Sequence, residues 1–224
     1  MNILAVIPAR GGSKGLIRKN LCILNCKPLI QYTLDAAKGS AYLTDIIVTT
    51  EDKEIKNYSK NYVKVQDRPE EHATDIAEVD PLLIYTVGEY EKQYNTNVNV
   101  VVLLYPTSPL RTSQIIDDCI DVFIKENYDS LLTLHEYDEY IWKVEKDCAV
   151  PINYDPLKRA PRQLEGWNQY VENKMVYVMK WELLKQTGCR LGGKIGYHKI
   201  DPLYAIDIDD KRDLKLAELI MNSM

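Results

Sequence analysis

Residues 2–20 read NILAVIPARGGSKGLIRKN. Residues 3–7 are continuously apolar and rich in β-branched side chains, which is typical of a strand buried on both faces of a sheet. Pro8 ends this run, and a glycine-rich loop follows that carries four cations: Arg10, Lys14, Arg18 and Lys19. The glycines permit tight turns and close approach of the backbone to a ligand. The loop is therefore predicted to hold a polyanion.

The net charge of the chain narrows the choice of polyanion. The formal charge is -5 at pH 7, so the basic loop stands against the overall balance. A nucleic-acid-binding protein is usually basic overall. A nucleoside triphosphate needs only a local patch of cations and loop N–H donors. We therefore expect a small-molecule partner and no nucleic acid, although a solvated turn whose charges only keep the loop wet remains the alternative.

Length and composition favour one domain over residues 1–224, with 46% hydrophobic residues. No apolar run reaches the roughly 18 residues that a membrane span needs, and no secretory leader is visible, so we expect a cytoplasmic protein without membrane contact. The five cysteines lack metal or disulfide spacing and are interpreted as small apolar fillers. The three histidines lie far apart, which argues against a histidine-based metal site.

Strand-like and helix-like segments alternate along the chain, which predicts the α/β class with a mostly parallel central sheet flanked by helices. The further expected strands cover residues 45–50, 98–105, 174–180 and 194–200. Expected helices cover residues 28–37, 80–92 with Asp80 as N-cap, a segment from Thr112 or Ser113 with a stripe of Ile116, Ile120, Phe123 and Ile124, and 210–221 with Asp210 as a cap.

Residues 106–111 form a loop at the carboxyl end of what is predicted to be the central strand. Ligands of open α/β sheets bind at this edge, so this loop and the first one are expected to share a crevice. Residues 136–173 break the regular alternation with aromatic, charged and proline residues. This excursion suits a ligand lid or a subunit interface, and equally a long surface connection with a small core of its own.

Residues 205–209 read AIDID and are predicted to form a strand. Strict alternation then sends Ile206 and Ile208 to one face and both Asp207 and Asp209 to the other. Two carboxylates on one face suit Mg²⁺, although solvated strand ends or helix caps are the alternative. Together with the basic loop, this pair predicts phosphoryl or nucleotidyl transfer. The loop has the spacing of neither a Walker A motif nor a dinucleotide-binding fingerprint.

Residues 7–15, followed by Lys19 and Asn20, closely resemble the opening motif of the acylneuraminate cytidylyltransferases, the CMP-sialic acid synthetases. Later motifs of that family occur in order: Arg68-Pro69, residues 73–75, residues 106–112, Arg162-Gln163, Glu172-Asn173 and residues 206–209. The resemblance implies a nucleotide-diphospho-sugar transferase fold of Rossmann-like type, homodimeric through an arm near residues 136–173. It also implies Mg²⁺-dependent attack of a nonulosonic acid's anomeric hydroxyl on the α-phosphate of CTP, which gives a CMP-sugar and pyrophosphate.

The resemblance also implies roles for individual residues. The catalytic set would be Arg10, Lys14, Lys19, Asp207 and Asp209, of which the two aspartates would hold Mg²⁺. The nucleotide-binding set would be Ala9, Arg10, Gly12, Ser13, Lys14, Lys19, Asn20, Arg68, Asp75 and Ala77. The sugar-binding set would be Tyr105, Thr107, Ser108, Lys143 and Arg162, the last two as cations for the sugar carboxylate.

The chain departs from the family pattern at several positions. Ile17 replaces a usual proline, Tyr105 a usual glutamine and Lys174 a usual glycine, and one extra residue lies between Arg162 and Asn173. These departures favour a relative of sialic acid, such as a diamino-dideoxy nonulosonate, as the substrate. Three other functions remain open: a CMP-Kdo-type synthetase, an Asp-x-Asp glycosyltransferase, and an inert relative that only binds the nucleotide.

Overall fold

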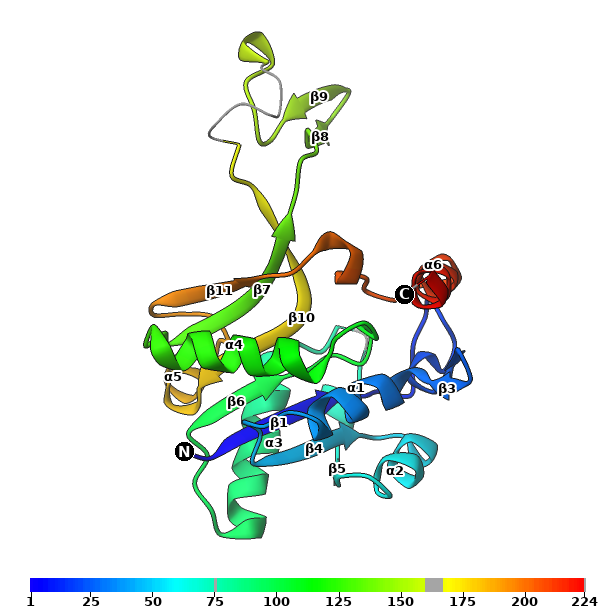
Figure 1. Cartoon of the computed structure of the whole chain (residues 1–224), viewed down its shortest axis with the longest axis vertical. Coiled ribbons are helices and arrows are strands. Elements are labelled where there is room, and N and C mark those ends of the chain that lie inside the picture. The colour runs from blue at the N-terminus through cyan, green and yellow to red at the C-terminus, as the bar shows by residue number, and fades with distance from the viewer. Residues whose placement is uncertain (75, 160–166, 224) are drawn as a thin grey trace.

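The computed structural model describes residues 1–74, 76–159 and 167–223. Its centre is a seven-stranded sheet in the order β11-β7-β10-β6-β1-β4-β5 (Figure 1). The strands are β1 (Ile3–Pro8), β4 (Asp45–Thr50), β5 (Lys64–Asp67), β6 (Val100–Leu103), β7 (Ser130–Glu136), β10 (Tyr170–Lys180) and β11 (Ile195–Lys199). Strands β1, β4, β5 and β6 pair in parallel, as do β7 and β11, whereas β10 runs antiparallel to both of its neighbours. The expected mostly parallel α/β sheet is confirmed.

Strand β1 shows why the opening run of the chain is apolar on every residue. Ile3, Ala5 and Ile7 belong to the core on one face of the sheet, and Leu4 and Val6 belong to the core on the other face. A strand covered on both faces has no solvated side that would select polar residues.

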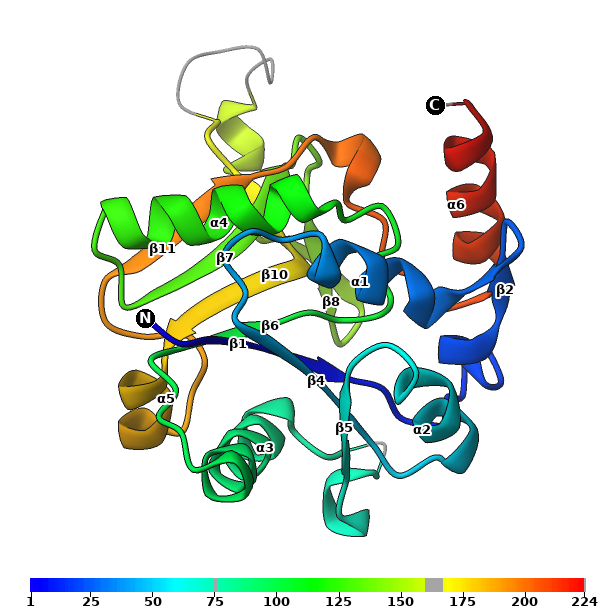
Figure 2. The same ribbon diagram turned by 60° about the horizontal axis from the view of Figure 1, so that its bottom comes forward.

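Helices cover both faces of the sheet (Figure 2). On one face α1 (Leu29–Lys38), α2 (Lys53–Ser59) and α4 (Ser113–Lys125) bury apolar side chains, and on the other face α3 (Val79–Tyr94) and α5 (Trp181–Thr187) do so. Thr112 caps α4, because its hydroxyl accepts a hydrogen bond from the Ile115 N–H at 3.2 Å. The α4 stripe is buried as expected except for Ile124, whose side chain is exposed.

A third, smaller core joins the two ends of the chain. Helix α6 (Lys211–Ser223) packs near the short strands β2 (Ile23–Leu24) and β3 (Lys27–Pro28), and buried Leu16, Leu24, Leu29, Ile208 and Ala217 lie between them. The C-terminal segment therefore lies beside the loop that follows β1 (Figure 1).

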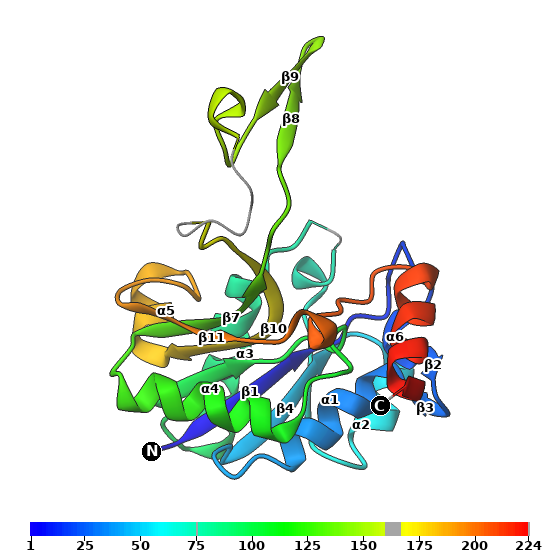
Figure 3. The same ribbon diagram turned by 45° about the horizontal axis from the view of Figure 1, so that its top comes forward.

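Between β7 and β10 the chain leaves the sheet as a projecting arm (Figure 3). The arm contains the hairpin of β8 (Trp142–Glu145) and β9 (Cys148–Pro151) and the 3₁₀ turn Pro156–Lys158. Tyr140 packs against Tyr154 and Trp167, with ring centroids 4.5 and 5.2 Å apart, which gives the arm a small aromatic core. Further 3₁₀ turns in the body are Lys19–Leu21, Glu70–His72 and Pro202–Tyr204.

Three local predictions are wrong. Residues 205–209 form no strand, because the Ala205 N–H closes a turn on the Pro202 carbonyl and the Ile208 N–H bonds to the Thr107 carbonyl in a loop, so neither pairs with another strand. Helix α3 begins at Val79 with Glu78 as the N-cap residue, and the Asp80 carboxylate pairs with Arg190 instead of capping. Cysteines 26, 148 and 189 are exposed rather than packed, whereas Cys119 is buried as expected.

Asp210 caps α6 as predicted, since its Oδ1 accepts from the Arg212 N–H at 2.6 Å and the Asp213 N–H at 3.2 Å.

Within the described ranges, none of the helices has the length and apolar content that a bilayer crossing requires.

Candidate active site

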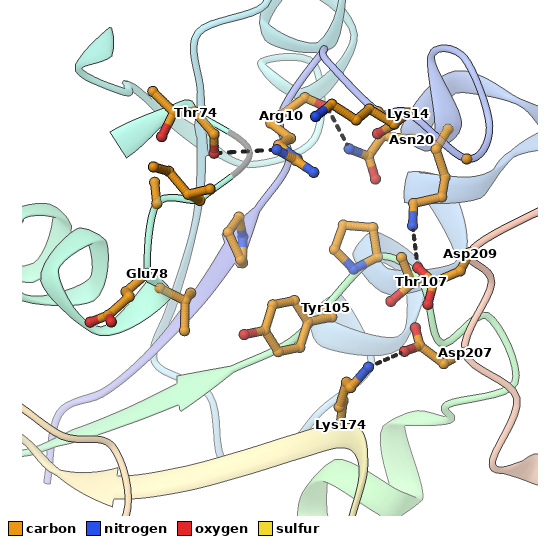
Figure 4. Close-up of a pocket in the computed structure, with 18 of the residues that line it drawn as sticks. Arg10, Lys14, Asn20, Thr74, Glu78, Tyr105, Thr107, Lys174, Asp207 and Asp209 are labelled. Atoms are coloured by element: carbon orange, nitrogen blue, oxygen red, sulfur yellow. Dashed lines mark hydrogen bonds and ion pairs between the residues drawn. The ribbon is translucent and has the colours of Figure 1, made fainter. Parts of the chain in front are cut away.

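A pocket of about 1210 Å³ opens at the edge of the sheet where β1 and β6 end and the antiparallel β10 begins. Its walls come from the loop after β1, the segment after β6, the start of β10 and residues 207–209 near the C-terminus (Figure 4). The carboxyl ends of parallel strands are the usual ligand edge of an open α/β sheet. The volume exceeds the roughly 300–1,000 Å³ that is usual for small-molecule sites.

The loop after β1 presents most of its cations to the pocket. Arg10, Lys14 and Lys19 line it, and Arg10 Nη1 donates to the Thr74 carbonyl at 3.3 Å. Buried Asn20 holds the loop in shape, because its Nδ2 donates to the Arg10 carbonyl at 2.8 Å. Arg18 instead pairs with Asp52 and Glu54, at 3.0 and 3.1 Å, at the start of α2. Three cations of the loop thus face a common space.

The two aspartates face the same space although their segment is not a strand. Ile208 between them is fully buried in the third core and anchors the segment, and its N–H donates to the Thr107 carbonyl at 2.8 Å. Asp207 Oδ2 pairs with Lys174 Nζ at 2.9 Å, and Asp209 Oδ1 pairs with Lys19 Nζ at 2.8 Å (Figure 4). The hydrogen bond to Asp207 raises the pKa of Lys174. Both carboxylates therefore lie on one side of the segment, as predicted, although the segment does not form the predicted strand.

Close backbone packing joins the two halves of this charged cluster. A Cβ added at Gly15 would collide with the carbonyl oxygen of Asp209. Only glycine allows the loop after β1 and the aspartate segment to approach this closely.

Arg68 lines the pocket from the segment that follows β5. The residue is 9% exposed, and its Nε donates to the His72 carbonyl at 2.8 Å. Burial lowers the pKa of this arginine, and the nearby Glu51 carboxylate opposes that shift. Glu51 also accepts a hydrogen bond from the Gly11 N–H at 2.6 Å.

The part of the pocket beyond Tyr105 has mixed character. The Tyr105 and Tyr177 rings meet edge to face with centroids 6.2 Å apart, and the Arg190 guanidinium lies 5.0 Å from the Tyr177 ring centroid. Arg190 Nη1 pairs with Asp80 Oδ1 at 2.7 Å, and the Tyr177 hydroxyl donates to Glu172. Burial raises the pKa of the Tyr105 hydroxyl. This region offers aromatic faces together with donors and acceptors of both signs.

Arg111 fixes the wall between these regions. Its buried guanidinium donates to the Met175 carbonyl at 2.6 Å through Nη1 and to the Tyr105 carbonyl at 2.9 Å through Nη2. Burial lowers the pKa of Arg111 to about 9. The arginine thus ties the end of β6 to the middle of β10.

The structure brings together most of the residues predicted for the site. Those lining the pocket are Arg10, Ser13, Lys14, Lys19, Asn20, Arg68, Ala77, Tyr105, Thr107, Asp207 and Asp209. Ala9 and Ser108 are instead buried, Gly12 is exposed, and none of these three lines the pocket. Asp75 and Arg162 lie outside the described residues.

Lys143 does not reach the pocket of its own chain. It lies on β8 in the arm and pairs there with Glu145 at 2.5 Å. The hairpin stands on the projecting arm, so Lys143 is not among the residues that line the pocket (Figure 3).

Several pocket residues have no predicted role, notably Glu172, Lys174, Tyr177 and Arg190. The register shift between Glu172 and Tyr177 in the β7–β10 pairing turns the first three of these positions in ways that simple alternation does not predict. Arg190 follows α5, and only the folded chain brings it to Asp80.

The carboxylate pair fits a Mg²⁺ ion by its donor chemistry. Magnesium is held by oxygen ligands, and one or two carboxylates suffice when phosphate oxygens and waters complete the shell. In the described parts of the chain no group of three or more His, Cys, Asp and Glu side chains could form an all-protein metal site. Asp207 and Asp209 therefore fit an ion that arrives with a phosphate ligand.

Sequence comparison identifies relatives over nearly the whole chain. N-acylneuraminate cytidylyltransferase A from Danio rerio is 33% identical over 222 residues, which cover 97% of this chain and 50% of that protein. CMP-N,N'-diacetyllegionaminic acid synthase from Legionella pneumophila is 38% identical over 124 residues, covering 54% of this chain and 53% of that protein. The chain thus spans about half the length of the Danio rerio protein, whereas the Legionella match covers about half of each chain.

Structure comparison agrees with the fold. A CMP:2-keto-3-deoxy-manno-octonic acid synthetase, solved in complex with CTP, superposes with a TM-score of 0.71 at 16% identity, and the match covers 100% of both chains. The family model described as cytidylyltransferase matches residues 4–220. The resemblance seen in the sequence motifs is therefore confirmed, and this chain belongs to the cytidylyltransferase family.

Proposed function

We propose that this protein transfers CMP from CTP to the anomeric hydroxyl of a sialic-acid-like nonulosonic acid and releases pyrophosphate. One observation carries the proposal: three cations of the first loop and two carboxylates from the other end of the chain face one pocket. Cations suit a triphosphate, and a carboxylate pair suits the metal that accompanies it. Membership of the cytidylyltransferase family and the names of its relatives support the same reaction.

The loop after β1 would bind the triphosphate. Arg10, Lys14 and Lys19 offer charge-assisted donors to its oxygens, and Ser13 offers a hydroxyl. Asn20, Arg68 and Ala77 would surround the ribose and cytosine. Lys19 exchanges its partner in this scheme, because its ammonium leaves Asp209 for a phosphate oxygen.

The chemical step is an in-line displacement at phosphorus. The anomeric oxygen forms a bond to the α-phosphorus, the bond from that phosphorus to the oxygen bridging to the β-phosphate breaks, and pyrophosphate leaves with the electron pair. The hydroxyl proton is released to solvent. Positioning and electrostatic stabilisation by the loop cations would supply most of the catalysis. Mg²⁺, held by Asp207 and Asp209, would supply charge neutralisation on the phosphates.

The sugar acid would occupy the part of the pocket lined by Tyr105, Thr107 and Tyr177. The aromatic faces and the neighbouring ion pair of Arg190 with Asp80 suit a substrate with acylamino groups and hydroxyls. The similarity to a synthase named for N,N'-diacetyllegionaminic acid supports a diamino-dideoxy nonulosonate. We also infer a homodimer through the arm, because exposed apolar side chains on it, such as Val144 at 78% and Leu157 at 94%, need cover.

The test is pyrophosphate release from CTP and Mg²⁺, measured with and without a panel of sugar acids. The panel contains N-acetylneuraminic acid, N,N'-diacetyllegionaminic acid and Kdo, and mass spectrometry identifies the CMP-sugar. We expect release that depends on the acid and is fastest with the diamino compound.

Each alternative has its own outcome. Fastest turnover of Kdo would identify a CMP-Kdo-type synthetase, and hydrolysis of a nucleotide sugar would favour an Asp-x-Asp glycosyltransferase. Calorimetric binding of CTP without turnover of any acid would support an inert relative and contradict the proposal.

A further inference from the structure

Lys174 has an unusual backbone conformation at the start of β10. Its φ of 59° lies in the left-handed region, inside the irregular stretch between Glu172 and Tyr177. Residues other than glycine seldom adopt this conformation unless the surrounding structure enforces it, and such residues gather at functional sites. Asn173 supplies the enforcement here, because its buried Oδ1 accepts from the Met175 N–H at 3.2 Å and from the Thr133 hydroxyl.

This conformation directs the Lys174 side chain into the pocket. Its ammonium lies 2.9 Å from Asp207 Oδ2, and the side chain is 53% exposed where it lines the pocket. A lysine ammonium has three donors, so one bond to Asp207 leaves donors for a ligand. The ammonium is thus held at one point of the wall while part of it still faces the pocket.

The position of Lys174 differs from that of the other cations considered for the proposed sugar region, which is the part of the pocket lined by Tyr105, Thr107 and Tyr177. Arg190 is paired with Asp80 at 2.7 Å and lies against the Tyr177 ring. Lys143 lies on the arm, in an ion pair with Glu145. Figure 4 shows Lys174 beside Asp207 and on the same side of the pocket as Tyr105. Lys174 therefore marks the border between the aromatic region and the carboxylate pair.

The chemistry of a nonulosonic acid matches this border. Its carboxylate is attached to the anomeric carbon, which also carries the reacting hydroxyl. A hydroxyl brought to the α-phosphate near Asp207 and Asp209 therefore carries the carboxylate with it, only two bonds away. We propose, on the basis of the proposed function, that Lys174 determines specificity for an acidic sugar by binding this carboxylate through its ammonium.

The test compares each acid with its methyl ester, which keeps the reacting hydroxyl but has no negative charge. KM values for N-acetylneuraminic acid, N,N'-diacetyllegionaminic acid and their methyl esters are measured at saturating CTP. The variants are Lys174→Gly, which suits the left-handed backbone, Lys174→Met, which keeps the length, and Lys174→Arg, which keeps the charge. Lys180→Met is the matched control, because Lys180 also lies on β10 and pairs with Asp129 at 2.7 Å, away from this pocket.

We expect Lys174→Gly and Lys174→Met to raise KM for the acids about 10- to 100-fold, the value of a charge-assisted hydrogen bond. KM for the esters and the calorimetric affinity for CTP should stay within about twofold, so the preference for acid over ester collapses. Lys174→Arg should restore part of that preference, and Lys180→Met should behave as wild type.

An unchanged acid-to-ester ratio in Lys174→Met, with CTP still bound, would overturn the assignment while leaving the proposed function intact. Absence of turnover of every acid by the wild-type protein would overturn the proposed function, and the assignment with it. The wild-type measurement tells these two failures apart.

Discussion

At the scale of a single residue, the two partners of the Asp209–Lys19 ion pair differ in their exposure. Its side chain is 70% exposed to the pocket, and its partner Lys19 is only 14% exposed. An exposed carboxylate is easily transferred from an ammonium to another cation, since little desolvation has to be reversed. The pair therefore suits a site in which Lys19 leaves Asp209 when the proposed triphosphate binds.

Asp209→Asn removes this charge with almost no change in volume. We expect turnover at saturating Mg²⁺ to fall on the order of 100-fold, because a stabilising charge at the reacting phosphate is lost. Steady-state pyrophosphate release measures the effect, and the thermal midpoint reports the fold. Asp118→Asn on α4 is the control, since Asp118 accepts from Gln114 at 2.8 Å outside the pocket. Unchanged turnover in Asp209→Asn would refute the metal role.

Gly15→Ala tests the close approach of the two chain ends. The added methyl group meets the Asp209 carbonyl, so we expect a loss of about 1–3 kcal/mol of stability and reduced turnover. Urea denaturation measures the first effect. Gly88→Ala in α3 is the matched control, because no heavy atom lies within 4 Å of the added Cβ there. We expect that change to stabilise the protein by about 0.5–1 kcal/mol.

Residue identities in the loop could be predicted because their chemistry is local. A run of cations among glycines indicates an anion site before any contact is known, and Arg10, Lys14 and Lys19 do face one pocket. Arg18 could not be distinguished from them, because its pairing with Asp52 depends on where α2 begins. Lys174 was visible only as a departure from a family pattern, since its direction follows from a backbone irregularity.

At the scale of elements, the projecting arm carries strongly exposed apolar side chains. Leu157→Asp places a charge on its most exposed apolar side chain, at 94%. If the arm forms the dimer, this variant should shift the mass measured by light scattering from two chains to one, while circular dichroism shows that the chain stays folded. Leu219→Asp on α6, where Leu219 is 60% exposed, should remain dimeric. A wild-type protein with the mass of one chain would contradict the dimer.

Elements with strong periodicity were predictable, and irregular ones were not. The buried run of β1 and the stripe of α4 follow directly from burial on two faces or on one. The aspartate segment failed as a strand because its neighbours are a loop carbonyl and a helix rather than another strand. Alternation describes where side chains point, and it does not require a hydrogen-bonded partner strand.

At the scale of the whole molecule, two histidines couple stability to pH. Burial lowers the pKa values of His135 and His198 in the folded protein, and Asp118 opposes this for His198. Near and below about pH 6.5 the unfolded chain therefore binds more protons than the folded protein does. The free energy of unfolding is highest above that pH and falls on acidification. Calorimetry should give a lower thermal midpoint at pH 5.5 than at pH 7.5, and His198→Gln should narrow the difference. Equal midpoints for the wild type at both values would contradict this.

The overall architecture was accessible from the order of elements, whereas the joining of distant parts was not. Alternating strands and helices are sufficient to predict a mostly parallel sheet. The single antiparallel strand β10, and the wall that Arg111 builds from it, depend on a crossover that no local pattern records.

The meeting of Gly15 with Asp209 has a consequence for biosynthesis. The ribosome adds Asp209 194 residues after Gly15, so the basic loop is made long before its acidic partners. In the interval the growing chain carries the ammonium groups of the loop without the aspartates that pair with them. The charged pocket should therefore form abruptly, once the aspartate segment has left the ribosome and packs against the loop.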